Sequence, residues 1–214
     1  IVEAHSPTQE AGEGSGHTIT VVSMGPERAV DAVRKALSMG ADDAIVITDS
    51  ALVGSDALAT SAVLAKVIGD GGYDMVICGT ESTDARMSVV PAMLAERLKF
   101  AQLTFASSVK VDGTNVSISR QTEFGVEQMQ APMPVVVSVV EKINEPRYPS
   151  FKGIMAAKKK PLETKSLGDI GVSAQSSWSV VNDSAVRPPR SAGIKITDEG
   201  DGGTKLVAFL QQRL

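Results

Sequence analysis

Three strand-like segments, each followed by a helix-like segment, constrain the fold of this chain more than any other feature. Each strand-like segment is a short apolar run, and each helix-like segment carries apolar residues at helical spacing. The strands are expected at 18–24, 44–48 and 74–78, and the helices at about 26–39, 55–68 and 88–98. Strands that alternate with helices in this rhythm predict an α/β fold with a parallel sheet covered by helices on both faces.

Local signals mark the boundaries of these helices. Pro26 is favourable at a first helical position, where its missing N–H has no helical partner in any case. Gly40 is a natural stop for the same helix. Ser55 is expected to be the N-cap of the second helix.

The pattern changes after residue 100. Short strands are expected at 103–111, 115–121 and 125–130. The turn Asp112-Gly113 between the first two predicts an antiparallel hairpin. The apolar run 134–139 is then expected to rejoin the main sheet.

We expect two parts in the chain: a nucleotide-binding α/β domain over residues 1–173 and a C-terminal arm over 174–214. The arm has little periodicity before a last amphipathic segment at 204–214. It cannot bury much apolar surface alone, so we expect it to lie on another subunit. Residues 1–5 resemble the end of a helix.

Composition excludes several classes of function. A net charge of −4 argues against a nucleic-acid-binding protein, and no apolar stretch is long enough to predict insertion in a membrane. Cys78 is the single cysteine, which excludes an internal disulfide and a CxxC metal site. A reducing compartment follows most simply, either the cytoplasm or, in a eukaryote, the mitochondrial matrix. The two histidines, His5 and His17, both lie in the polar N-terminal stretch, so no metal site is expected.

The loop 79–88 is a candidate anion site. Ligands of open parallel sheets bind beyond the carboxyl ends of the strands, where helix N-termini point. This loop combines a glycine, several hydroxyls and a following helix N-terminus, which together favour a phosphate. The alternative is an ordinary strand–helix loop with capping hydroxyls.

No catalytic residue is predicted. The chain lacks the G-x-G-x-x-G, Walker, H-E-x-x-H and G-x-S-x-G motifs. Carboxylates such as Asp84 and Glu123 are expected to be solvated surface charges. Cys78 ends an apolar strand and is expected to be a buried structural thiol.

The segment 144–161 mixes apolar and basic residues, and its prolines restrict the backbone. Tyr148, Phe151, Ile154 and Met155 alternate with Arg and Lys. Apolar anchors surrounded by cations suit a docking surface for an acidic partner. The alternative for the lysines at 158–160 is a solvated basic turn.

Residues 139–160, with the pattern V-x-E-K-I-N-E-P-R-Y-P-S-F-K-G-I-M-A-A-K-K-K, resemble the signature of electron transfer flavoprotein beta subunits. Shorter matches lie at 25–26, 36–42, 79–84 and 191–195. The resemblance implies an adenine-nucleotide alpha-hydrolase-like, Rossmann-like fold that holds a structural AMP. It further implies a heterodimer with an alpha subunit that carries the redox-active FAD.

In that family the beta subunit docks acyl-CoA and related dehydrogenases, as in fatty acid beta-oxidation. Electrons pass to the FAD and on to a quinone oxidoreductase, without bond-making chemistry in the beta subunit. The positions that the resemblance places at the AMP are Met24, Gly79, Thr80, Glu81, Ser82, Thr83, Asp84, Ser88, Val89 and Val90. Those that it assigns to partner recognition, in a loop over 139–161, are Asn144, Glu145, Pro146, Arg147, Tyr148, Phe151, Ile154, Met155, Lys158 and Lys159.

The chain departs from the family pattern in places. Family members begin with a strand, a nucleotide-contacting loop and a helix, which the resemblance places upstream of Ile1. Residues 85–88 replace the small or polar residues usual after Asp84. The run 89–91 lacks the Gln-Thr-Gly-like stretch of the flavin-binding branch, so AMP is favoured over a second FAD. Gln121 stands where several members have a glutamate that faces the flavin domain. Two other interpretations are an ATP-using enzyme of the same fold and a non-catalytic scaffold for partner proteins.

Overall fold

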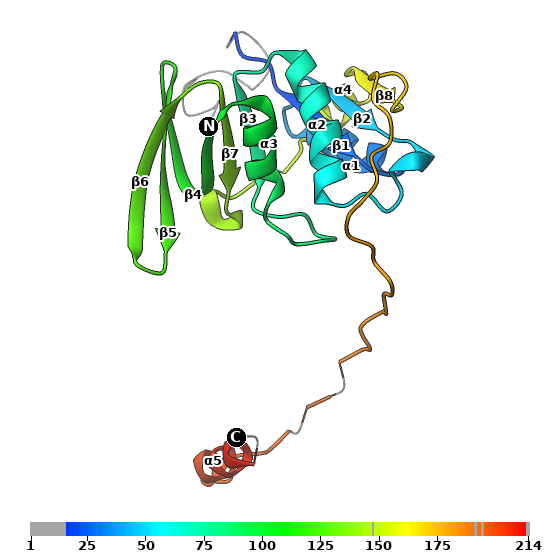
Figure 1. The fold of residues 1–214 in the computed structure, drawn as a ribbon. Helices are drawn as coiled ribbons and strands as arrows, with labels where there is room; N and C mark the ends of the chain where they lie inside the picture. The colour runs from blue at the N-terminus through cyan, green and yellow to red at the C-terminus, as the bar shows by residue number, and fades with distance from the viewer. Residues whose placement is uncertain (1–15, 147, 191, 194, 213–214) are drawn as a thin grey trace. The chain divides into compact units, whose positions relative to one another are not determined.

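The computed structural model describes residues 16–146, 148–190, 192–193 and 195–212, and the chain forms two compact units, residues 1–180 and 181–214. Unit 1 contains β1 (Thr20–Met24), α1 (Ala29–Ser38), β2 (Asp43–Ile47), the 3-10 turn η2 (Ser50–Leu52), α2 (Ala57–Gly71), β3 (Met75–Gly79), α3 (Val90–Leu98), β4 (Ala101–Asp112), β5 (Asn115–Thr122), β6 (Gly125–Pro132), β7 (Val135–Val139), η3 (Glu141–Ile143), α4 (Phe151–Ala157) and β8 (Leu162–Lys165) (Figure 1).

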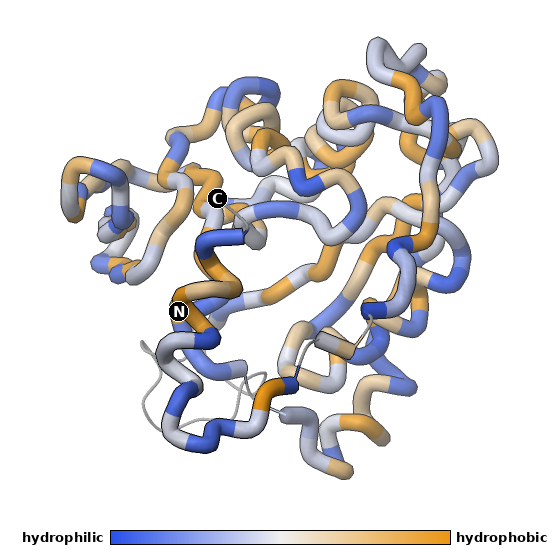
Figure 2. Tube along the Cα trace, turned by 90° about the horizontal axis from the view of Figure 1, so that it is seen from below, coloured by the Kyte–Doolittle hydropathy of each residue, from blue (hydrophilic) through white to orange (hydrophobic). Residues whose placement is uncertain are grey.

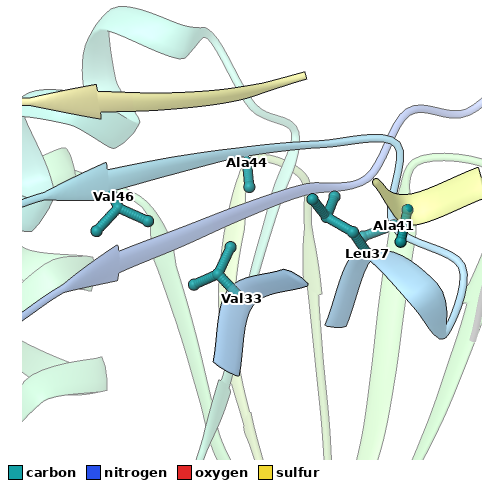
Figure 3. Close-up of a cluster of buried hydrophobic side chains, with 6 residues drawn as sticks. Val33, Leu37, Ala41, Ala44 and Val46 are labelled. Carbon is teal, nitrogen blue, oxygen red and sulfur yellow. The ribbon is translucent and has the colours of Figure 1, made fainter. Parts of the chain in front are cut away.

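The first sheet has three parallel strands in the order β1-β2-β8. Alternate residues of the central strand β2 belong to different cores. Ala44 and Val46 pack with Val33 and Leu37 of α1 (Figure 3), whereas Ile47 packs with Val63 and Val67 of α2 on the other face. The sheet is therefore covered by a helix on each face, as its near-continuous apolar sequence predicts.

The second sheet has the order β3-β7-β4-β5-β6. β3, β7 and β4 are parallel, while β4, β5 and β6 are antiparallel. The central strand β7 is the most buried, because Val135, Val136 and Val137 have no exposed surface. Val136 packs with Leu94 of α3 on one face. β4 joins the parallel and antiparallel halves of this sheet, and its turn into β5 uses Gly113 at a φ of 57°.

The expected parallel α/β fold and its antiparallel hairpin are confirmed. One difference is that the parallel strands are divided between two sheets, and no hydrogen bond within the described residues joins β1 to β3. The N-cap of α2 is Asp56, whose carboxylate accepts from the N–H of Ala59 at 3.0 Å, so the expectation of Ser55 is wrong by one residue.

Two elements of unit 1 were not expected from the sequence. The segment 139–161 is not a loop throughout, because it contains the helix α4. β8 follows it and extends the first sheet beside β2.

Unit 2 contains the helix α5 (Gly202–Gln211), close to the predicted amphipathic segment 204–214. Figure 2 shows an orange run with blue at its ends just before the C-terminus, and in the sequence of α5 the apolar residues 206–210 lie between Lys205 and Gln211. Leu206, Val207 and Leu210 are each more than half exposed.

Candidate functional site at the ends of β3 and β7

Two predicted functional segments leave the same edge of the second sheet. β3 and β7 are parallel, with Gly79 beside Val139, so both strands end there. The Thr80 hydroxyl donates to the Val139 carbonyl at 2.9 Å and ties the two ends together. A hollow of about 410 Å³ lies beside this contact, lined by Thr80, Glu81, Val140, Glu141 and Lys142. The structure therefore brings the start of the predicted nucleotide loop to the start of the predicted recognition segment.

The loop between β3 and α3 holds its shape through its own side chains. The Ser88 hydroxyl donates to the Glu81 carboxylate at 3.1 Å. Asp84 accepts from the N–H of Ala85 at 2.7 Å. Hydrogen bonds from the Ser82 hydroxyl and then from Ala85 hold the pKa of Asp84 below its ordinary value, so this carboxylate is ionised at neutral pH. Glu81 and Asp84 thus both accept hydrogen bonds from other residues of the loop.

The backbone of this loop is unusual just before α3. Arg86 and Ser88 have φ of 50° and 57°, in the left-handed region that non-glycine residues seldom adopt. Val89 is the N-cap of α3, and among the described residues no side chain caps this helix. Pro91 in the first turn has no N–H, so Val90 and Ala92 carry the first-turn N–H groups that have no partner inside the helix. They are donors that a phosphate can accept from, and the helix dipole favours its negative charge.

The predicted nucleotide residues form one contiguous loop and one separate residue. Gly79, Thr80 and the exposed residues 81–87 lead into Ser88, Val89 and Val90 at the start of α3. Met24 instead ends β1 in the first sheet, where it packs, partly buried, against the cluster of Ile47 and Val63. No hydrogen bond in the described part of the chain joins Met24 to the loop.

The predicted recognition residues divide in a similar way. Asn144, Glu145 and Pro146 are exposed after η3, and the Asn144 side chain donates to the Glu145 carbonyl at 3.1 Å. Tyr148 is 92% exposed. Arg147 lies outside the described residues.

The remaining recognition residues belong to α4 and the turn after it. Ser150 caps the helix by accepting from the N–H of Gly153 at 3.0 Å. Phe151 is 80% exposed, and Ile154 and Met155 are 43% and 48% exposed. Residues three and four apart share one face of a helix, so these three side chains form a single apolar surface. Lys158 and Lys159 are exposed beside it.

Sequence reasoning missed the cap that orders this surface. Ser150 directly precedes the apolar residues of α4, and a serine in that place is a known sign of a helix start. The prolines at 146 and 149 and the glycine at 153 favoured a loop instead.

Two other kinds of chemistry, a reactive thiol and a metal site, have no support in the described residues. Cys78 is half-buried, and burial raises the pKa of its thiol to about 11, so it is a poor nucleophile at neutral pH. No three His, Cys, Asp or Glu residues gather as a metal site within the part of the chain that the structure describes. In the same residues, no helix has the length and apolar character to span a bilayer.

Comparisons with known proteins point in one direction. The family model described as "Electron transfer flavoprotein domain" matches residues 3–170. The chain is 48% identical over 208 residues to the "Electron transfer flavoprotein subunit beta" of Mycobacterium leprae, which covers 94% of this chain and 78% of that protein. It is 34% identical over 210 residues to the protein of the same name from Megasphaera elsdenii, covering 92% of this chain and 77% of that one.

Proposed function

This chain belongs to the electron transfer flavoprotein family, among its beta subunits, and on that premise we propose that it binds AMP and docks dehydrogenases for electron delivery. In this proposal an alpha subunit holds the FAD that accepts the electrons. An acyl-CoA dehydrogenase supplies them in the cytoplasm, and a quinone oxidoreductase receives them. The chain itself contributes binding and orientation.

The apolar surface of α4 is the observation that carries this proposal. The exposed Phe151 lies beside Ile154 and Met155, and exposed apolar side chains that cluster in this way mark sites of protein contact. Burial of a phenylalanine side chain contributes roughly 1.5–3 kcal/mol, or one to two decades in affinity. An electron carrier must leave one partner before it reaches the next, so one such anchor suits its task. Lys158 and Lys159 would add a smaller, salt-sensitive contribution to the association rate.

The start of α3 supports the AMP assignment. The N–H groups of its first turn would hold the phosphate, since no described side chain caps them. Glu81 and Asp84 would then shape the loop through Ser88, Ser82 and Ala85 rather than contact the anion. AMP has no redox chemistry, so its contribution when bound would be to the stability of the fold.

The docking proposal is tested with Phe151→Ala in the complex with the alpha subunit. Flavin reduction by a reduced acyl-CoA dehydrogenase is followed over a range of dehydrogenase concentrations, after flavin spectrum and AMP content are checked. We expect a normal flavoprotein whose KM for the dehydrogenase rises about tenfold or more. A normal KM would remove Phe151 from this role, and a lost flavin would make its role structural.

The cofactor proposal is tested on the wild-type protein. We expect the chain to co-purify with a larger, yellow, flavin-containing subunit, and acid extraction of the complex to release AMP with the FAD. If the isolated beta chain releases FAD in one-to-one amount, its bound cofactor is a second flavin and not AMP. ATP turnover by the purified chain would favour an enzyme of the same fold.

A further inference from the structure

Two cations join the C-terminal ends of α1 and α4. Nη1 of Arg34, on α1, donates to the carbonyls of Ala157 and Lys160 at 2.8 and 2.7 Å. Nζ of Lys160, just after α4, donates to the carbonyls of Leu37 and Ala41 at 3.3 and 2.5 Å. Each helix end therefore receives a positive charge from the other segment, where the helix dipole favours one.

The helix α4 depends on such contacts because it has only seven residues. An isolated helix of this length is unstable in water. Its inner face packs on α1. Ala157 is 3% exposed in the cluster with Val33 and Leu37. At Gly153, an added Cβ would lie 2.7 Å from the Ser38 carbonyl oxygen.

The contacts with α1 decide which face of α4 points outward. Gly153 and Ala157 are four residues apart and face α1. Lys160 lies on the same side, where it donates to the Ala41 carbonyl just after α1. Phe151, Ile154 and Met155 lie on the exposed face. A rotation or fraying of α4 would break the Arg34 bonds and withdraw part of the apolar surface.

We infer that Arg34 is a positioning residue for partner docking, acting with Lys160 to hold α4 with its apolar face outward. This inference rests on the proposed docking function of α4. It also divides the lysine run by role: Lys158 and Lys159 face solvent, whereas Lys160 is half-buried and bound to α1.

The test compares Arg34→Gln with Lys35→Gln in the complex with the alpha subunit. Both remove one positive charge from α1, but Lys35 is exposed, whereas Arg34 bonds to the end of α4. Two measurements are made on each: hydrogen exchange of the amides at 151–160, and the KM and kcat for flavin reduction by a reduced acyl-CoA dehydrogenase at low and high salt. Arg34→Lys is the conservative variant, since an ammonium group can replace part of the bonding.

For Arg34→Gln we expect faster exchange in α4, an about tenfold higher KM and an unchanged kcat, because charge-assisted hydrogen bonds are lost. Lys35→Gln should behave as wild type and Arg34→Lys should be intermediate. The effect of Arg34→Gln should persist at high salt.

Three results would overturn the inference. The first is an equal effect of Lys35→Gln on KM that disappears at high salt. The second is unchanged hydrogen exchange of α4 in Arg34→Gln. The third is faster exchange of α4 in Arg34→Gln with a normal KM, while Phe151→Ala raises the KM. A normal KM in Phe151→Ala instead rejects the proposed docking function, and the role of Arg34 in docking with it. The exchange data then still report whether Arg34 holds α4.

Discussion

The Asp56 carboxylate connects two segments that are far apart in the sequence. One oxygen caps α2 through the N–H of Ala59 at 3.0 Å. The other accepts from the N–H groups of Trp178 and Ser179 at 2.6 and 3.1 Å. Ser177 adds a bond to the Asp56 N–H at 2.9 Å. The end of unit 1 is thus fastened to the start of α2, directly before the chain enters unit 2 at residue 181.

Asp56→Asn should separate the two roles of this side chain. Asparagine keeps one acceptor and caps helices as well as aspartate does, but its NH₂ group cannot accept from Trp178 and Ser179. We expect α2 to keep its helicity while the amides of 177–180 exchange faster with solvent. Asp70→Asn, on the same helix and paired only with Lys66 in the described contacts, is the matched control. Equal exchange in Asp56→Asn and wild type would show that these bonds do not fasten the segment.

The hydrogen bonds that Asp56 accepts from Trp178 and Ser179 should depend on pH in a defined direction. N–H donors, first that of Ala59 and then that of Trp178, hold the pKa of Asp56 below its ordinary value. A lowered folded-state pKa means that the stabilisation is present above the unfolded pKa of about 3.9 and is lost as the pH falls through the folded value. Protection of the amides at 177–180, measured relative to their intrinsic exchange rates at each pH, should therefore stay constant from neutral pH down to about pH 5 and fall only below about pH 4. A loss of protection near pH 6 would implicate a different group.

At the level of elements, the sequence predicted the strands and helices whose apolar residues recur with a regular period. α1, β2, α2 and α3 bury apolar residues at strand or helical spacing, whereas β1 and β3 have no fully buried residue, and all six elements appear within a few residues of the expected bounds. β8 was missed because its four residues, LETK, are mostly polar and partly exposed beside β2. α4 was missed because its residues include a glycine and follow two prolines, and because some of the contacts that hold it, such as those of Arg34, come from more than a hundred residues away.

The candidate site shows the same limit. The loop 79–90 could be predicted because a parallel strand and the following helix enclose it. The meeting of this loop with the start of the recognition segment requires the pairing of β3 with β7, in which Met75 lies beside Val135. The sequence predicts that 134–139 rejoins the main sheet, but no local pattern identifies β3 as its neighbour, so this pairing could not be predicted.

The N-terminus of α3 offers a prediction at this scale. Val89→Asp would give the helix a side-chain cap and place a negative charge where the phosphate is proposed to bind. We expect the AMP affinity of the complex to fall about tenfold or more, because the anion loses donors and meets a like charge. AMP released by acid extraction, after dialysis at a series of AMP concentrations, measures the change.

Val89→Asn is the control for that experiment, since it supplies a similar cap without the charge. It should lose less AMP than Val89→Asp does. Full AMP content in Val89→Asp would place the phosphate elsewhere.

At the scale of the whole molecule, the two units differ in how they use apolar residues. Unit 1 places its valines and leucines in clusters on both faces of β2 and of β7. In unit 2, considered by itself, the helix α5 keeps an apolar face that its own unit covers only in part. Val181 and Val186, before this helix, are 84% and 96% exposed. Such a segment suits the surface of another subunit better than solvent.

Deletion of residues 196–214 should therefore weaken assembly with the alpha subunit. Leu206, Val207 and Leu210 are 56%, 54% and 51% exposed, and burial of that remaining surface would contribute about 2–5 kcal/mol. We expect the dissociation constant of the heterodimer to rise at least about tenfold and FAD to be lost faster on dilution. In the full-length chain, Leu206→Asp with Leu210→Asp should reproduce the effect, while Thr204→Asp with Gln211→Asp, at exposed positions of the same helix, should not. If the truncated chain assembles as tightly as the intact one and retains its flavin, the C-terminal segment does not serve as an arm on the alpha subunit.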